Sequence, residues 1–181
     1  MSVRGLVDVL PLTPLQEGLL FHTLYDERSS DVYVIQLLFD LDGPLDSGTL
    51  RRAAEALLYR HANLRVAIRY ENLTSPVQVI PHDVALPWTD LDLSTMDPVE
   101  QPAELARVQS EDRARGFDLE RAPLVRFTLV RLGVARHRLV LTCHHILLDG
   151  WSTPVLVREL FAVYASGGDV SVLPAVPPYR D

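Results

Sequence analysis

Short β-forming runs and amphipathic helical segments alternate along the whole chain, and this alternation limits the fold more than any other feature of the sequence. The β-forming runs lie at residues 33–41, 66–70, 77–80, 124–132 and 138–143. Apolar residues recur at helical spacing in four other segments, at about 14–25, at 47–60, from 98 or 102 to 116, and at 152–166. Strands interspersed with helices predict an α/β or α+β class, in which helices pack on a mixed β-sheet.

A few capping and turn residues mark where these elements begin and end. Thr13 can cap the first helix, and Pro14 suits its first position. Ser152 is expected to cap the last helix, with Pro154 in its first turn. Gly133 separates the last two β-forming runs, which predicts that they form a hairpin.

The composition excludes several classes of protein. With 181 residues, the chain can bury one sizeable core, so one domain is expected. Seventeen basic residues against twenty-four acidic ones leave a net charge of −7, which argues against nucleic acid or a membrane as a partner. Cys143 is the only cysteine, which excludes an intramolecular disulfide and suits a reducing compartment. Signal-peptide features and long apolar runs are absent from the sequence, so a cytoplasmic location is expected.

The segment from His144 to Trp151 carries the densest group of chemically capable side chains, and it follows a strand and precedes a helix. Neighbouring side chains on a strand point to opposite faces, so His145 is expected to share the face of Leu139, Leu141 and Cys143 while His144 takes the other. Two imidazoles aimed apart and one carboxylate suit zinc poorly, so no metal is expected. A buried histidine pair bonded to the backbone and a functional site both remain open on the residues alone.

Four motifs in register resemble one known family. The sequence HHILLDGWS at 144–152 resembles the HHxxxDG signature of condensation domains from nonribosomal peptide synthetases. Further matches follow the family's order: LTPLQEGLLFH at 12–22, RHANLR at 60–65, and GFDL at 116–119 with Pro123 and Leu124.

The resemblance carries a fold with it. Such domains consist of two chloramphenicol-acetyltransferase-like units that face each other across a channel. Residues 1–172 then correspond to the N-terminal subdomain, and residues 173–181 begin the linker to the C-terminal subdomain.

The resemblance also implies a reaction. The free amine of an aminoacyl group on a downstream acceptor carrier protein attacks the thioester of an acyl or peptidyl group on an upstream donor carrier protein. Both substrates arrive on phosphopantetheine arms, and the domain itself binds no cofactor. The amino acids of the motif at 12–22 and of residues 147–149 are similar to those of the subclass with a D-configured donor. A lone half is expected to be inactive and to self-associate through the face that its C-terminal subdomain normally covers in cis.

Residue roles come from the same resemblance. His145 would reach the reacting atoms and His144 would support the loop. Gly150 would offer its N–H to an oxyanion, or would serve only as a turn residue. Asp149 is expected to form a structural ion pair with Arg65. Gln16 and His22 are expected to line the channel, or else to belong to an ordinary helix face. Trp151 is expected in the channel wall or in the core.

Magnitudes favour positioning over proton abstraction as the task of His145. An α-amine has a pKa near 8, so about a tenth of it is already neutral at pH 7. A general base contributes about 10²- to 10⁴-fold, whereas orientation of reactants reaches effective molarities of about 10⁵ M. Alternative functions are an epimerisation domain of the same superfamily, a non-catalytic partner-docking relative, and a free-standing acetyltransferase-like trimer.

Overall fold

A four-stranded mixed sheet lies at the centre of the computed structural model, which describes residues 5–25 and 32–176. Its strands, in spatial order, are β2 (Val34–Asp42), β7 (Arg136–His144), β6 (Val125–Arg131) and β5 (Trp88–Asp92). Strand β5 runs parallel to β6, and the other neighbours are antiparallel. The predicted mixed sheet and the predicted β6–β7 hairpin are therefore confirmed.

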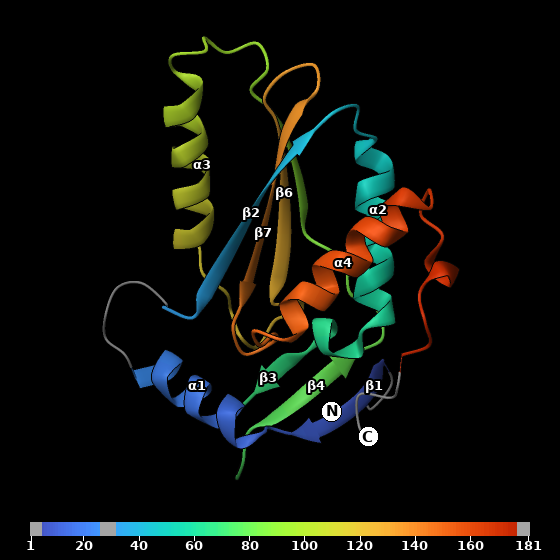
Figure 1. Cartoon of the computed structure of the whole chain (residues 1–181). Helices are drawn as coiled ribbons and strands as arrows, with labels where there is room; N and C mark the ends of the chain where they lie inside the picture. Colours follow the sequence, from blue (N-terminus) through green and yellow to red (C-terminus); the bar gives the residue numbers. More distant parts are fainter. Residues whose placement is uncertain (1–4, 26–31, 177–181) are drawn as a thin grey trace.

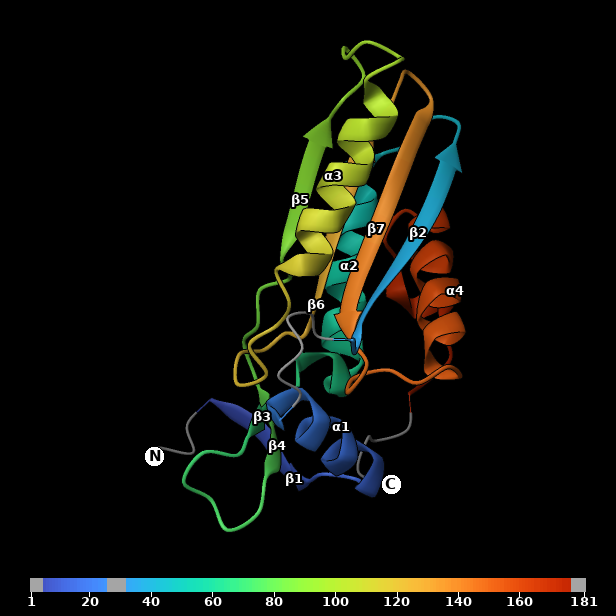
Figure 2. The ribbon, with the colours of Figure 1, turned by 90° about the vertical axis from the view of Figure 1, so that its left-hand side faces the viewer.

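Helices cover both faces of this sheet. Helices α2 (Ser47–Arg60) and α4 (Ser152–Ala165) lie on one face, and α3 (Gln101–Ala114) lies on the other (Figures 1 and 2). The core under α2 and α4 contains the strand residues Leu139, Leu141 and Cys143, which share one face as their alternation predicts. Its helical side includes Leu50, Ala53, Ala54, Leu57 and Leu58 from α2. Their spacing in the sequence is the reason that the helix buries one stripe.

A second sheet of three antiparallel strands, in the order β1-β4-β3, lies beside α1 (Pro14–Tyr25) at the lower end of Figure 1. Its strands are β1 (Leu6–Pro11), β4 (Val77–Pro81) and β3 (Ala67–Arg69). Strands β3 and β4 confirm the predicted pair around a turn, in which Asn72 has a φ of 58°. Two short 3-10 helices lie at Ala62–Arg65 and Val170–Val172.

The start of α1 shows why this helix begins where the sequence predicts. The Thr13 hydroxyl accepts a hydrogen bond from the Gln16 backbone N–H at 3.3 Å, and the Gln16 carbonyl oxygen Oε1 accepts one from the Thr13 N–H at 3.0 Å. This reciprocal pair is a capping box, which satisfies two N–H groups that a helix start leaves unpaired. The predicted cap at Thr13 is confirmed.

The sequence did not predict β1 and β5. Strand β5 has five residues, of which three are polar, and its ladder is formed with the distant strand β6. Strand β1 is largely exposed at the edge of its sheet. In the described part of the chain, no helix has both the length and the hydropathy to cross a membrane. Residues 177–181 of the expected linker lie outside the described residues, and the domain boundary at 172 stays a prediction.

Candidate functional site

The candidate site is the loop between β7 and α4, at the lower end of the central sheet in Figure 1. Strand β7 ends at His144, and the chain then turns before α4 begins at Ser152. Ile146 inserts into the small core that joins this loop to α1 and the second sheet. The loop therefore packs against this small core, and its two histidines have defined surroundings.

The ring of His145 is half-buried and held by its own loop. Its Nδ1 lies 2.7 Å from the carbonyl oxygen of Leu148, and its backbone N–H donates to the Tyr33 carbonyl at 2.8 Å. Since a carbonyl only accepts hydrogen bonds, Nδ1 carries the hydrogen. The neutral ring then has its lone pair on Nε2, to which no described residue forms a hydrogen bond. This arrangement presents Nε2 as a hydrogen-bond acceptor for another group.

His144 is completely buried and takes the opposite tautomer. Its Nδ1 accepts a hydrogen bond from the backbone N–H of Ile146 at 3.1 Å, so the hydrogen of the neutral ring is on Nε2. Nε2 lies 3.4 Å from the hydroxyl oxygen of Thr23 on α1. The position of His144 suits a residue that supports the loop.

The expected ion pair between Asp149 and Arg65 is wrong. Arg65, with 6% of its surface exposed, donates from Nη1 to the carbonyls of Leu58 and Tyr59, both at 2.7 Å, and from Nε to Pro81 at 3.3 Å. These carbonyls lie in the last turn of α2 and at the end of β4. The guanidinium therefore forms its hydrogen bonds with backbone oxygens. The exposed Asp149 is not among its partners in the described part of the chain.

Asp149 instead holds the turn that leads into α4. Its Oδ1 accepts hydrogen bonds from the N–H groups of Ser152 at 2.7 Å and Trp151 at 3.1 Å. Hydrogen bonding from Ser152, followed by that from Trp151, lowers the pKa of the Asp149 carboxyl. Ser152, which we expected to be the cap, is the first residue of the helix. Trp151 occupies the cap position without a side-chain cap hydrogen bond, so Asp149 satisfies backbone N–H groups where the turn meets the helix.

Gly150 and Trp151 form the outer part of the loop. Gly150 is exposed, and a Cβ added to it would meet no heavy atom within 4 Å. Its φ lies outside the left-handed region, so the backbone does not require glycine here. Its role as an oxyanion donor stays a prediction. Trp151 is 89% exposed, which excludes a core position in this chain.

A shallow hollow of about 330 Å³ lies beside Trp151. It is mostly apolar, and its lining includes Leu64, Leu148, Val155 and Leu156. His61 also lines it. The hollow adjoins the residue whose carbonyl holds His145, so it belongs to the surroundings of the loop.

Gln16 and His22 both come from α1 but differ in their surroundings. Gln16 is only 9% exposed, and its amide is engaged by the backbone and by Gln78. It therefore does not line an open surface, and the expected channel position is wrong for this residue. His22 is exposed and lies near the rings of Phe21 and Tyr33. A channel position stays a prediction for His22, as it does for Trp151.

The sequence reasoning also missed a partly buried polar cluster beside the hollow. Nε2 of His61 lies 2.6 Å from Oε2 of Glu159. Arg60 donates to the same oxygen from Nε at 3.2 Å. This cluster joins the end of α2 to the middle of α4, beside the hollow. The sequence feature that could have indicated this cluster is Glu159, an acidic residue between the buried Leu156 and Leu160 of an otherwise apolar helix face.

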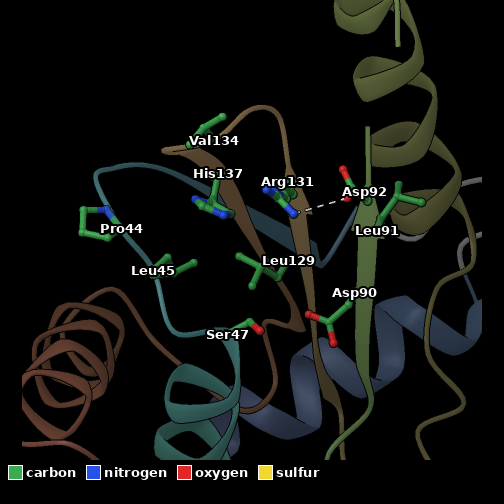
Figure 3. A pocket seen from close by; sticks show the side chains of 10 residues that line it. All are labelled: Pro44, Leu45, Ser47, Asp90, Leu91, Asp92, Leu129, Arg131, Val134 and His137. Carbon is green, nitrogen blue, oxygen red and sulfur yellow. Dashed lines mark ion pairs between the residues drawn. The ribbon is translucent and has the colours of Figure 1, made fainter. Parts of the chain in front are cut away.

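A larger pocket lies at the other end of the sheet. Its volume is about 510 Å³, and side chains from β5, β6 and β7 reach into it, including Asp92, Arg131 and His137 (Figure 3). Arg131 and Asp92 form an ion pair there at 3.6 Å. His137 is seven residues from His144 on the same strand, a separation of about 23 Å. This pocket is therefore separate from the histidine loop.

No group of three or more histidine, cysteine, aspartate or glutamate side chains within residues 5–25 and 32–176 is placed to hold a metal ion. The expectation that the domain uses no metal stays a prediction.

Comparisons with known proteins agree with the motifs. The family model described as Condensation domain matches residues 7–181. One of the proteins of linear gramicidin synthase from Brevibacillus parabrevis is 41% identical over 97% of this chain, which spans 3% of that protein. Bacitracin synthase 3 of Bacillus licheniformis is 34% identical over 96% of this chain and 3% of its own length.

Solved structures agree in fold. The first condensation domain of the calcium-dependent antibiotic synthetase, in complex with substrate analogue 2a, has a TM-score of 0.77 and 26% identity, over 94% of this chain and 40% of its own. The starter condensation domain of rhizomide synthetase RzmA has a TM-score of 0.76 and 23% identity, over 88% of this chain and 38% of its own. The predicted chloramphenicol-acetyltransferase-like fold is confirmed, and this chain is part of such a domain. It belongs to the condensation domain family.

Proposed function

We propose that this chain supplies the histidine-bearing half of a condensation domain that forms amide bonds in a nonribosomal peptide synthetase. The acceptor amine attacks the carbonyl carbon of the donor thioester; a C–N bond forms and the C–S bond breaks. The amine proton is transferred, and the donor's phosphopantetheine leaves as the thiol. The observation that carries this proposal is the hydrogen bond from Nδ1 of His145 to Leu148, which leaves Nε2 as an acceptor.

His145 acts in this proposal mainly by orienting the amine. The lone pair on Nε2 accepts a hydrogen bond from the attacking N–H and takes the proton as the tetrahedral intermediate develops. About a tenth of an α-amine is already neutral at pH 7, so removal of a proton before attack contributes little. A group held by its own loop loses little freedom on binding, which favours positioning. The Gly150 N–H is the candidate donor to the oxyanion.

The partners follow from the same proposal. An upstream carrier protein brings the donor, whose last residue is D-configured, and a downstream carrier protein brings the aminoacyl acceptor. Both use phosphopantetheine arms, and the domain holds no cofactor of its own. The other half of the domain, supplied in cis, completes the channel, so the chain alone is inactive. Exposed apolar side chains, among them Leu15, Phe21 and Tyr25 on α1, favour its self-association.

The test uses the synthetase that contains this chain, with donor and acceptor carrier proteins loaded enzymatically. Mass spectrometry should detect the coupled product on the acceptor carrier, and His145→Ala should reduce its formation by about 10²-fold or more. His137→Ala, at the far end of the same strand, is the matched control and should couple normally. Normal coupling by His145→Ala would contradict the proposal. An epimerised donor without amide product would identify an epimerisation domain instead.

A further inference from the structure

The carboxamide of Gln16 is a polar group buried at the junction of three segments. Its Nε2 lies 3.2 Å from the carbonyl oxygen of Ile146 and 3.1 Å from Oε1 of Gln78, while its Oε1 accepts from the N–H of Thr13. These partners determine the orientation of the amide, because a carbonyl requires a donor and an N–H requires an acceptor. An amide buried to this extent is stable only if its hydrogen bonds are satisfied.

Gln78 extends the contact into the second sheet. It is 2% exposed, and its Nε2 donates to the carbonyl of Pro11 at 3.0 Å. Through Gln16, the β1–β4 pair and the first turn of α1 are thus joined directly to the histidine loop. The segments involved are far apart in the sequence: Gln16 and Ile146 are separated by 130 positions.

The same helix contacts the loop a second time. Thr23 lies seven residues after Gln16, about two helical turns along the same face, and approaches Nε2 of His144 at 3.4 Å. The helix therefore contacts the residues on both sides of His145. The outer face of α1 is left exposed.

The backbone around His145 is held on each side of the ring. The N–H of His145 donates to Tyr33, and the N–H of Ile146 donates to His144. The carbonyl of Ile146 is held only by Gln16 among the hydrogen bonds of the described residues. The N–H of the same peptide, that of Leu147, donates to the His144 carbonyl at 3.0 Å. Loss of the Gln16 bond leaves this peptide with one hydrogen bond in place of two, which loosens the turn that leads to Leu148, the residue that orients the ring.

We propose that Gln16 is a positioning residue for His145, an inference that rests on the proposed function of that histidine. Gln16 touches no substrate; it acts through the Ile146 carbonyl. A displacement of about 1 Å at a reacting group costs about 10²-fold in rate. Loss of the Gln16 bond should therefore reduce kcat while leaving KM for the loaded carrier proteins unchanged.

Gln16→Glu is the sharpest variant, because it keeps the shape of the side chain but turns its donor into an acceptor. A carboxylate would face two oxygen atoms, those of Ile146 and Gln78. The matched control is Gln101→Glu, whose Nε2 also donates to two carbonyls, those of Leu93 and Leu132, at the opposite end of the sheet. Both variants lose two hydrogen bonds, and because Gln16 is more buried than Gln101, Q16E should lower the melting temperature more. Only Gln16 adjoins the histidine loop.

The experiment measures coupling kinetics and amide hydrogen exchange of residues 145–148 in the full synthetase. We expect Q16E to lower kcat about 10²-fold, and to raise exchange in that loop. Q101E should change neither. Lower pH should partly restore Q16E relative to the native protein, because a protonated carboxyl regains one donor. Equal losses for Q16E and Q101E, or an unchanged loop in Q16E, would overturn the inference.

A second variant keeps the test decisive if Q16E does not fold. Gln16→Met removes the hydrogen bond to Ile146 without placing a charge in the core, and should show the same rise in exchange and fall in kcat. His145→Ala, measured in parallel, separates the two proposals. If it couples normally, the proposed function fails; if it is inactive while Gln16→Met exchanges and couples normally, only the positioning role fails.

Discussion

Nδ1 of His145 lies 2.7 Å from the carbonyl oxygen of Leu148, three residues later in the same loop. The contact selects one tautomer of the ring and aims its other nitrogen away from the loop. A side chain whose orientation is set before substrate arrives loses less entropy on binding.

Replacing His145 by Asn tests the separate roles of its two nitrogens. The amide nitrogen of Asn occupies nearly the place of Nδ1 and can donate to Leu148, but Asn has nothing in place of Nε2. We expect His145→Asn to change the free energy of unfolding by less than about 1 kcal/mol, while coupling falls about 10²-fold or more. Urea denaturation and the carrier-protein coupling assay measure the two effects. Coupling at the native rate would show that Nε2 is dispensable.

Asp149→Ala should cost about 1 kcal/mol, because it removes the exposed hydrogen bonds that Asp149 accepts from Trp151 and Ser152. Rupture of a buried ion pair would instead cost about 3–5 kcal/mol, and Asp149 is exposed with no such partner in the described chain. Asp149→Asn should retain most of the stability, because the amide oxygen of Asn can accept the same two hydrogen bonds. The hydrogen bonds that lower the pKa of Asp149 stabilise its charged form, so their contribution is lost as pH falls through the folded-state pKa. Denaturation of the three proteins at several pH values checks both points.

The buried Asp112 between α3 and the central sheet should matter much more to stability. Its carboxylate accepts hydrogen bonds from Arg126 at 2.7 Å and from Thr142 at 2.5 Å. Asp112→Ala leaves the buried Arg126 uncompensated and should cost about 3–5 kcal/mol. The control is Asp118→Ala, which breaks an exposed pair with Arg121 and should cost less than about 1 kcal/mol. Similar losses for the two variants would contradict this assignment.

The same carboxylate makes stability depend on pH. Burial alone would raise the pKa of Asp112, but hydrogen bonds from Arg126 and Thr142 and the nearby arginine charges outweigh burial and lower it. Its stabilisation is therefore complete above the ordinary pKa of 3.8 and is lost as pH falls through the lower folded-state value. Asp112→Ala should weaken this acid dependence. An unchanged acid transition would contradict the contribution assigned to the Asp112 carboxylate.

Cys143 should be inert to thiol reagents in the folded protein. Burial raises the pKa of its thiol to about 12, although the Arg126 charge opposes the shift. Only a minute fraction is thiolate at pH 8, and the sulfur is inaccessible. Alkylation by iodoacetamide should begin only on unfolding, with a denaturant midpoint that matches circular dichroism. Rapid labelling of the native protein would contradict the burial of this residue.

Local patterns in the sequence were sufficient for much of the fold. Leu50, Ala53 and Leu57 recur at the helical period, so α2 could be predicted without knowledge of its partners. The β6–β7 hairpin was equally local, because its strands are separated only by a short turn at Gly133. The four motifs led to the family and to the HHxxxDG loop as the candidate site.

Elements and pairs that depend on distant chain segments could not be predicted. Strand β5 is polar and short, and it is ordered by parallel pairing with β6, more than thirty residues later. The family resemblance suggested an ion pair between Arg65 and Asp149, yet each is satisfied by nearby backbone groups.

The sequence by itself determined the fold class, the family and the loop that bears His144 and His145, because helical period, strand alternation and motif order are written in neighbouring residues. The tertiary structure alone decided which nitrogen of each histidine carries the hydrogen and that Gln16 holds Ile146. The physical reason is that a buried hydrogen bond depends on which donors and acceptors folding brings within about 3 Å, and residues far apart in the chain supply them.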